Sequence, residues 1–146
     1  MSELKRVLFV CIGNACRSQM AESFARAYGS DVLVPSSAGL FPAKAVPPDT
    51  LRAMEEKNLD LSRQVPKSLE DLDGAKFDII LNMSGFPVPP MGGTAVREWA
   101  VPDPIVMDYE GHCEVRDRIE RLVMNLILEL RRLEKREAAK AVPPNS

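Results

Sequence analysis

The stretch that decides the fold covers residues 7–18 and reads VLFVCIGNACRS. Its first four residues are all apolar, which is typical of a strand buried on both faces of a parallel sheet. A short glycine-containing loop follows at residues 11–16. Residues 20–28 then place Met20, Phe24 and Ala27 on one helical face, with Gly29 where the helix should stop. The sequence therefore opens with a strand–loop–helix unit.

Strand-like and helix-like segments alternate through the rest of the chain. We expect further strands at residues 32–34, 77–81 and 99–101. We expect helical segments at residues 50–57, 68–72 and 114–136. A proline- and glycine-rich stretch at residues 84–98 predicts a long irregular loop. This order predicts an α/β protein with a three-layer, doubly wound fold, in which helices cover both faces of a four-stranded parallel sheet.

The composition indicates a single globular domain with no affinity for nucleic acid. The chain has 146 residues, of which 45% are hydrophobic and 27% charged, and its net charge is −2. We expect one catalytic domain over residues 1–138 and a disordered tail over residues 139–146. No apolar run is long enough to span a bilayer, and the N-terminus lacks a secretory signal, so we expect no membrane partner and a cytoplasmic location.

A cysteine and an arginine flank the loop between the first strand and the first helix. Backbone N–H groups of such a loop, together with the helix dipole, predict an anion-binding site. Arg17 can bind two oxygens of the anion, while Cys11 lies beneath it as a thiolate nucleophile. Gly13 and Asn14 tolerate positive φ angles, and Ser18 can donate a hydrogen bond to the thiolate. The expected substrate-binding residues are Ile12, Gly13, Asn14, Ala15, Cys16 and Ser18.

Asp103 is the candidate general acid. It follows the last expected strand and lies between two prolines, which stiffen its loop. Ligands of parallel sheets bind beyond the carboxyl ends of the strands, where both Asp103 and Cys11 are expected. Asp103 could protonate the leaving group and then activate a water molecule that hydrolyses the cysteinyl intermediate.

Other interpretations of the cysteines are weaker. Three cysteines do not form a disulfide framework, and a buried core cysteine does not explain the polar residues around Cys11. A zinc site could use Cys11, Cys16, His112 and Cys113, but adjacent ligands at 112 and 113 make tetrahedral closure awkward. We therefore expect neither a metal nor a cofactor, and we assign His112 and Cys113 to the start of the last helix.

Residues 7–22 resemble the low-molecular-weight protein tyrosine phosphatase superfamily, which includes the thioredoxin-coupled arsenate reductases. Residues 37–39, 59–62, 66–69, 77–80 and 102–104 also follow the order of the family. The resemblance implies that Cys11 is the nucleophile, Arg17 the transition-state clamp and Asp103 the general acid. It also implies that Asn14 and Ser37 hold the loop by hydrogen bonds, and that Cys16 traps oxidised Cys11 as a reversible disulfide.

Features of both branches of this superfamily occur in the chain. Residues 19–22, 66–69 and 115–119 and Trp99 resemble the arsenate reductases. Ile105 and Val106 stand where phosphatases carry an aromatic pair. The reductases have two further cysteines after the third strand, but residues 82–87 contain none, and Ser84 takes the first such position. Lys67 stands where some reductases carry an acid for a monovalent cation, so we expect no potassium requirement.

These features predict a phosphatase that hydrolyses aryl phosphates or phosphotyrosine proteins through a cysteinyl-phosphate intermediate. Arsenate reduction, with external thiols or thioredoxin as the reductant, is the alternative. A non-catalytic oxyanion-binding module is a third possibility, which the joint presence of Cys11, Arg17 and Asp103 disfavours.

Overall fold

The structure is a computed structural model, and it describes residues 3–72, 74–89, 91 and 93–141. The elements are, in chain order, β1 (Lys5–Cys11), α1 (Arg17–Gly29), β2 (Leu33–Gly39), α2 (Pro48–Glu55), the 3₁₀ turn η1 (Leu69–Leu72), β3 (Ile79–Asn82), β4 (Val96–Glu98), the 3₁₀ turn η2 (Pro104–Val106) and α3 (Tyr109–Ala141). This order confirms the predicted α/β class.

The sheet has four parallel strands in the order β2-β1-β3-β4. β1 is central, and its residue Phe9 pairs with Ser37 of β2 and with Leu81 of β3. Cys11 is therefore carried to the carboxyl edge of the sheet, beside Gly39. The predicted four-stranded parallel sheet is confirmed.

The fourth strand lies at Val96–Glu98, within the expected loop, so its prediction at residues 99–101 was wrong. An edge strand bonds on one side only, and this one exposes Arg97 and Glu98, so its sequence shows no apolar pattern. The apolar Val101 is buried instead in the cluster under the helices.

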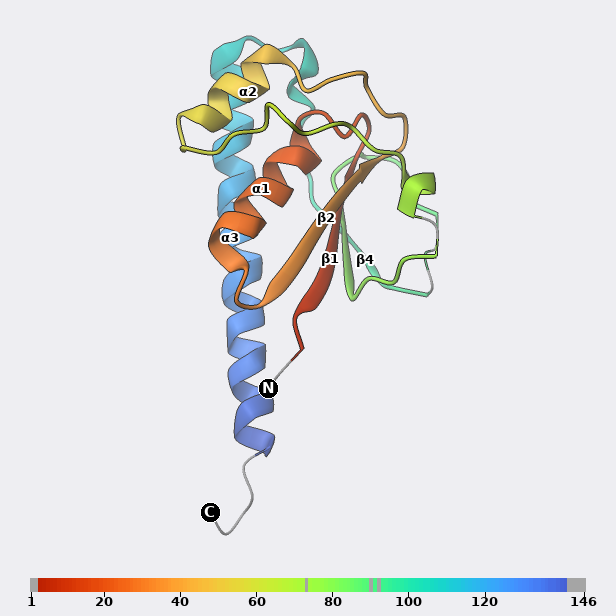
Figure 1. Cartoon of the computed structure of the whole chain (residues 1–146), viewed down its shortest axis with the longest axis vertical. Coiled ribbons are helices and arrows are strands. Elements are labelled where there is room, and N and C mark those ends of the chain that lie inside the picture. Colours follow the sequence, from red (N-terminus) through yellow and green to blue (C-terminus); the bar gives the residue numbers. More distant parts are fainter. Residues whose placement is uncertain (1–2, 73, 90, 92, 142–146) are drawn as a thin grey trace.

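The sheet separates two apolar clusters. Val7 and Phe9 face the cluster shared with the α-helices, while Leu8 and Val10 face the opposite cluster. In Figure 1, α1, α2 and α3 lie together on one side of the sheet. The other side is covered by η1 and by loop residues, so the helical layer expected there is thin.

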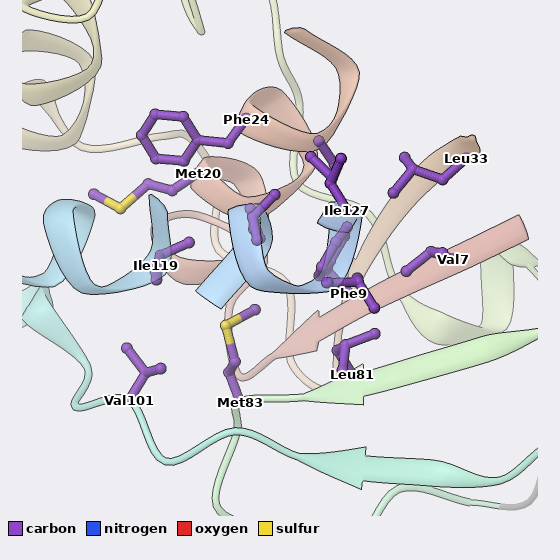
Figure 2. Close-up of a cluster of buried hydrophobic side chains, with 14 of the residues drawn as sticks. Val7, Phe9, Met20, Phe24, Leu33, Leu81, Met83, Val101, Ile119 and Ile127 are labelled. Atoms are coloured by element: carbon purple, nitrogen blue, oxygen red, sulfur yellow. The ribbon is translucent and has the colours of Figure 1, made fainter. Parts of the chain in front are cut away.

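The long helix α3 holds the helical layer together. It spans 33 residues and packs against α1 and α2. Figure 2 shows side chains of α1, α3, β1 and β3 meeting in one cluster around Ile119 and Ile127. Despite its length, no helix in the described part of the chain is both long and apolar enough to cross a membrane.

The helix α3 extends beyond the predicted residues 114–136 at both ends. Residues 139–141, expected in the tail, are helical. The stretch at residues 137–141 reads EAAKA, which consists of strong helix formers, and this explains the extension. The rest of the expected tail, residues 142–146, lies outside the described residues.

Gly29 allows the close approach of α1 and α3. It ends α1 as predicted, but the capping residue Ser30 has right-handed helical angles, so no left-handed glycine cap forms. A Cβ atom on Gly29 would lie 2.7 Å from Cγ1 of Ile127. Packing, rather than helix termination, therefore accounts for the glycine.

The backbone of the loop after β1 rests on the segment that follows β2. The carbonyls of Cys11, Ile12 and Gly13 accept hydrogen bonds from the N–H groups of residues 40, 41 and 43, at 3.1, 2.8 and 2.9 Å. A Cβ atom on Gly39 would lie 2.7 Å from both the nitrogen of Asn14 and the carbonyl oxygen of Ile12. Only glycine permits this contact between two backbones.

We predict that Ile127→Ala lowers the free energy of unfolding by about 2–5 kcal/mol, because a fully buried side chain leaves a cavity. The neighbouring Leu128 is 43% exposed, so Leu128→Ala serves as the control and should change stability by less than about 0.5 kcal/mol. Urea denaturation measures both. Equal losses in the two variants would contradict the packing described for α3.

We predict that Gly39→Ala destabilises the protein by about 1–3 kcal/mol, because its Cβ meets backbone atoms that cannot move aside. Gly13→Ala is the matched control. Its Cβ would meet Ala43 at 3.5 Å, an ordinary contact, so no loss of stability is expected. Thermal unfolding of the two variants distinguishes a requirement for glycine at residue 39 from a general sensitivity of the loop.

Candidate active site

Cys11 is buried at the carboxyl end of β1, and its sulfur contacts the first turn of α1. Cys11 Sγ lies 2.9 Å from Ser18 Oγ. Ser18 Oγ also accepts a hydrogen bond of 2.7 Å from Nδ2 of Asn14. Because Ser18 accepts there, its own proton can point to the sulfur of Cys11. This arrangement directs a hydrogen-bond donor at the sulfur of the cysteine.

Asn14 holds the loop in shape from the inside. Its φ angle is 49°, in the left-handed region, whereas Gly13 does not adopt a positive φ, contrary to expectation. Asn14 Oδ1 accepts hydrogen bonds from Nε2 of Gln19 at 3.1 Å and from the N–H of Lys67 at 2.7 Å. The buried amide thus joins the loop to α1 and to the segment before η1.

Ser37 does not make the hydrogen bond expected of it. Its side chain is fully buried on β2, and Oγ has no hydrogen-bond partner among the residues that the structure describes. Ser37 pairs with Phe9 in the sheet, so its side chain lies on the face of the apolar helical cluster. Its small size fits that packing, but Asn14 provides the hydrogen bonds to the loop.

The loop after β1 carries N–H groups that are not used in hydrogen bonds within the protein, as far as the structure describes it. Within the described part of the chain, none of the N–H groups of residues 12–16 donates to a protein acceptor, although several loop carbonyls are bonded. The loop leads directly into the N-terminus of α1. Successive free N–H groups at a helix N-terminus form an anion-binding site.

Arg17 is buried and is held by the ends of two other segments. Its Nη1 donates to the carbonyl of Met83, after β3, and to that of Val101 at 2.9 Å. Its Nη2 lies 3.4 Å from Oδ2 of Asp103. Among the described residues, its Nε is buried without a hydrogen-bond partner. The guanidinium is therefore fixed in place and retains a donor for an anion.

Asp103 lines the same cavity as Cys11, and its side chain is 34% exposed. Its Oδ1 accepts a hydrogen bond of 3.1 Å from the N–H of Ile105 and caps η2. A cavity of about 180 Å³ brings together Cys11, the loop, Arg17 and Asp103. A second cavity of about 490 Å³ adjoins it, since both are lined by Ile12, Arg17 and Asp103.

Ser84 occupies the place where the sequence comparison expected a redox cysteine in reductases. It is buried beside the second cavity, and its Oγ donates to Oδ1 of Asn82 at 2.7 Å. Cys16 lines the first cavity together with Cys11. Cys113 lies in a different environment, where its Sγ donates to Glu56 at 3.3 Å. Among the described residues, no three His, Cys, Asp or Glu side chains are grouped to hold a metal ion.

Cys16 is hydrogen-bonded to Thr50, which in turn contacts His112, and neither residue was expected at the site from the sequence. Thr50 Oγ1 donates to Cys16 Sγ at 3.2 Å and lies 3.0 Å from Nδ1 of His112. All three side chains are buried. Burial raises the pKa of the Cys16 thiol to about 11, with smaller contributions from the charges of Asp103 and Cys11, so Cys16 is protonated at neutral pH.

The position of His112 in the sequence carried a signal that could have identified it. It precedes the buried residues Val115 and Ile119 of α3 by three and seven positions, the spacing of one helical face. A histidine on a buried face needs a polar partner. Thr50 is that partner, but only the fold brings α2 and α3 together.

Known proteins with similar sequences and folds share this arrangement of elements. The model of the family described as "Low molecular weight phosphotyrosine protein phosphatase" matches residues 6–86. A glutaredoxin arsenate reductase from Synechocystis sp. is 34% identical over 131 residues, which cover 87% of this chain and 99% of the relative. A solved arsenate reductase in its phosphate-binding state has a TM-score of 0.77 at 30% identity, over 87% of this chain and 99% of that one.

The YwlE arginine phosphatase from Geobacillus stearothermophilus has the same fold, with a TM-score of 0.73 over 95% of this chain and 98% of its own. Its identity of 22% supports the fold alone. The family match covers more than half of the chain and includes the loop from Cys11 to Arg17. The chain therefore belongs to the low molecular weight phosphotyrosine protein phosphatase family.

Proposed function

We propose that the protein is a cysteine-dependent phosphatase that hydrolyses aryl phosphates, including phosphotyrosine, through a cysteinyl-phosphate intermediate. The main support for this proposal is the set of residues that line one cavity. A single small cavity is lined by Cys11, Arg17, Asp103 and the loop residues Ile12, Gly13, Ala15 and Cys16, whose N–H groups have no acceptor among the described residues. A nucleophile, oxyanion donors and a proton donor for the leaving group are thereby available together.

In the proposed first step, the Cys11 thiolate attacks phosphorus while the N–H groups and Arg17 bind the non-bridging oxygens. These donors are fixed before the reaction, so they stabilise the charge of the transition state without reorganising. Asp103 gives a proton to the leaving oxygen. Asp103 lines the same cavity as Cys11, so both groups can reach a phosphate ester bound there.

In the proposed second step, the Asp103 carboxylate accepts a proton from water, and the water attacks phosphorus. The phosphorus–sulfur bond breaks, and Cys11 leaves as a thiolate, which the Ser18 hydroxyl at 2.9 Å can stabilise. Asp103 thus serves as acid and then as base, and inorganic phosphate is released.

Apolar side chains in and near the cavity could contact an aryl leaving group. Ile105 lines the cavity and is half exposed. Phe41, two residues after the end of β2, is 77% exposed. Trp99 lines the adjoining cavity, which meets the first at Ile12 and Arg17. Phe41 and Trp99 could provide the aromatic contacts that Ile105 and Val106 do not.

Arsenate reduction is the second candidate, and the names of the relatives favour it. Arsenate is a tetrahedral oxyanion, so the same loop could bind it. Reduction needs an electron-donating thiol, and Ser84 stands where a reductase cysteine was expected. An external small thiol or thioredoxin would therefore be the reductant. A protein that only bound oxyanions would show neither reaction.

We predict that the purified protein hydrolyses para-nitrophenyl phosphate and that Cys11→Ser abolishes the reaction, because an alcohol is not ionised at neutral pH. Cys113→Ser is the control and should retain full activity, since Cys113 does not line the cavity. Parallel assays with arsenate and either glutathione or thioredoxin test the alternative. Arsenite formation without phosphate release would reject the phosphatase, and tight phosphate binding with neither reaction would indicate a binding module.

We predict that Asp103→Asn slows the hydrolysis of phenyl phosphate by about a hundredfold or more. The nitrophenolate of para-nitrophenyl phosphate leaves without a proton, so that substrate should be affected much less. The ratio of kcat/KM for the two substrates in each protein isolates the role of the acid. Equal slowing of both substrates would contradict proton donation by Asp103.

A further inference from the structure

We propose that Thr50 and His112 form a buried proton relay for Cys16, which enables Cys16 to close a disulfide with Cys11 once a peroxide has oxidised Cys11. The relay connects three elements, because Cys16 caps α1, Thr50 lies in the first turn of α2 and His112 lies in the first turn of α3. The proposal rests on only one part of the proposed function, namely that Cys11 is a reactive thiolate.

The geometry supplies a continuous path for a proton. Thr50 Oγ1 lies 3.2 Å from Cys16 Sγ and 3.0 Å from His112 Nδ1. A hydroxyl has one proton and can accept another. In one orientation Cys16 donates to Thr50 and Thr50 donates to Nδ1. In the reverse orientation Nδ1–H donates to Thr50 and Thr50 donates to the sulfur. The two orientations differ by the transfer of one proton from Cys16 to His112.

Cys16 needs such a path in order to react. It is buried, and its raised pKa keeps it a thiol, although only the thiolate is a nucleophile. Within the described part of the chain, Thr50 is the only hydroxyl bonded to its sulfur, and its contact leads on to the single histidine of the sequence. Phosphate transfer uses neither Thr50 nor His112, so that reaction does not account for the pair.

Cys11 is the partner that the site offers to Cys16. Both sulfurs belong to the same loop and line the same cavity of about 180 Å³. Cys11 also contributes to the raised pKa of Cys16, which reflects their proximity. The cavity is open to small polar molecules, and the Cys11 thiolate at its base is the group that a peroxide would oxidise first.

The reaction balances as follows. The Cys11 thiolate attacks one oxygen of hydrogen peroxide, the oxygen–oxygen bond breaks and hydroxide leaves. Cys11 is thereby oxidised to a sulfenic acid and the peroxide is reduced. Cys16 attacks Cys11 Sγ, so the sulfur–sulfur bond forms, the sulfur–oxygen bond breaks and hydroxide leaves. Thr50 accepts the proton of Cys16 and passes its own proton to Nδ1 of His112. That proton finally neutralises the hydroxide released in this second step, whose products are the disulfide and water. An external dithiol then restores both thiols.

The test follows the fate of Cys11 after the full-length reduced protein is mixed with hydrogen peroxide. Samples are alkylated at intervals, and mass spectrometry distinguishes the disulfide from the sulfinic acid of Cys11. We expect Thr50→Val to close the disulfide at least about tenfold more slowly than the wild type, so that sulfinic acid accumulates. Thr50→Ser restores the hydroxyl and should restore the rate.

His112→Asn separates proton acceptance from hydrogen bonding. The asparagine amide can bond to Thr50 from the position of Nδ1, but it cannot take up a proton, so we expect a loss similar to that of Thr50→Val. Closure at the wild-type rate in either variant would overturn the relay. A Thr50→Ser variant as slow as Thr50→Val would also overturn it, because Thr50 would then only support the packing.

Hydrolysis of para-nitrophenyl phosphate by the same variants shows whether the loop remains intact. This assay also separates the two proposals. A wild-type protein that closes the disulfide through Thr50 but hydrolyses no phosphate ester would reject the phosphatase and keep the relay. A protein that hydrolyses the ester but forms only sulfinic acid would reject the relay and keep the phosphatase.

Discussion

The chemistry of this protein depends on how the backbone of one loop is oriented at the end of a buried strand. The carbonyls of Cys11, Ile12 and Gly13 are bonded to the segment after β2, which leaves the N–H groups of residues 12–16 for the opposite side. The rest of the fold supports this backbone conformation. The amide of Asn14 forms hydrogen bonds from inside the loop, and the absence of a side chain at Gly39 leaves room for the loop backbone.

Rigid elements set the distances in the site. β1 ends at Cys11, the proposed nucleophile, and α1 begins with Arg17, so a strand and a helix fix these two residues independently of the surface loops. Asp103 is less constrained, because η2 is short and exposed. This difference suits the roles that we propose for Asp103, since an acid that also acts as a base must accommodate first a leaving group and then water.

Much of the fold and of the candidate site could be predicted from the sequence, because local patterns encode them. The apolar run before Cys11 predicted the strand, and the periodic pattern of α3 predicted the helix. The spacing from Cys11 to Arg17 predicted the candidate anion site. β4 was not predicted at its observed position, because an exposed edge strand has no apolar pattern. The contact between Thr50 and His112 was not predicted, because 62 residues separate them in the sequence and only the packing of the fold brings them together. The hydroxyl of Ser37 was expected to bond to the loop, but it is buried on β2 without a hydrogen-bond partner among the described residues.

The anchoring of Arg17 has a consequence for how variants of this protein are interpreted. The guanidinium that we propose to bind the substrate anion also joins two segments of the protein. It links the end of β3 to the segment before Asp103, through the carbonyls of Met83 and Val101. A lysine cannot replace such a fork, because its ammonium is a single point of charge. Any substitution at residue 17 therefore removes a structural crosslink along with a positive charge. Loss of activity in an Arg17 variant does not by itself identify a catalytic role, and proof of that role needs a substitution elsewhere.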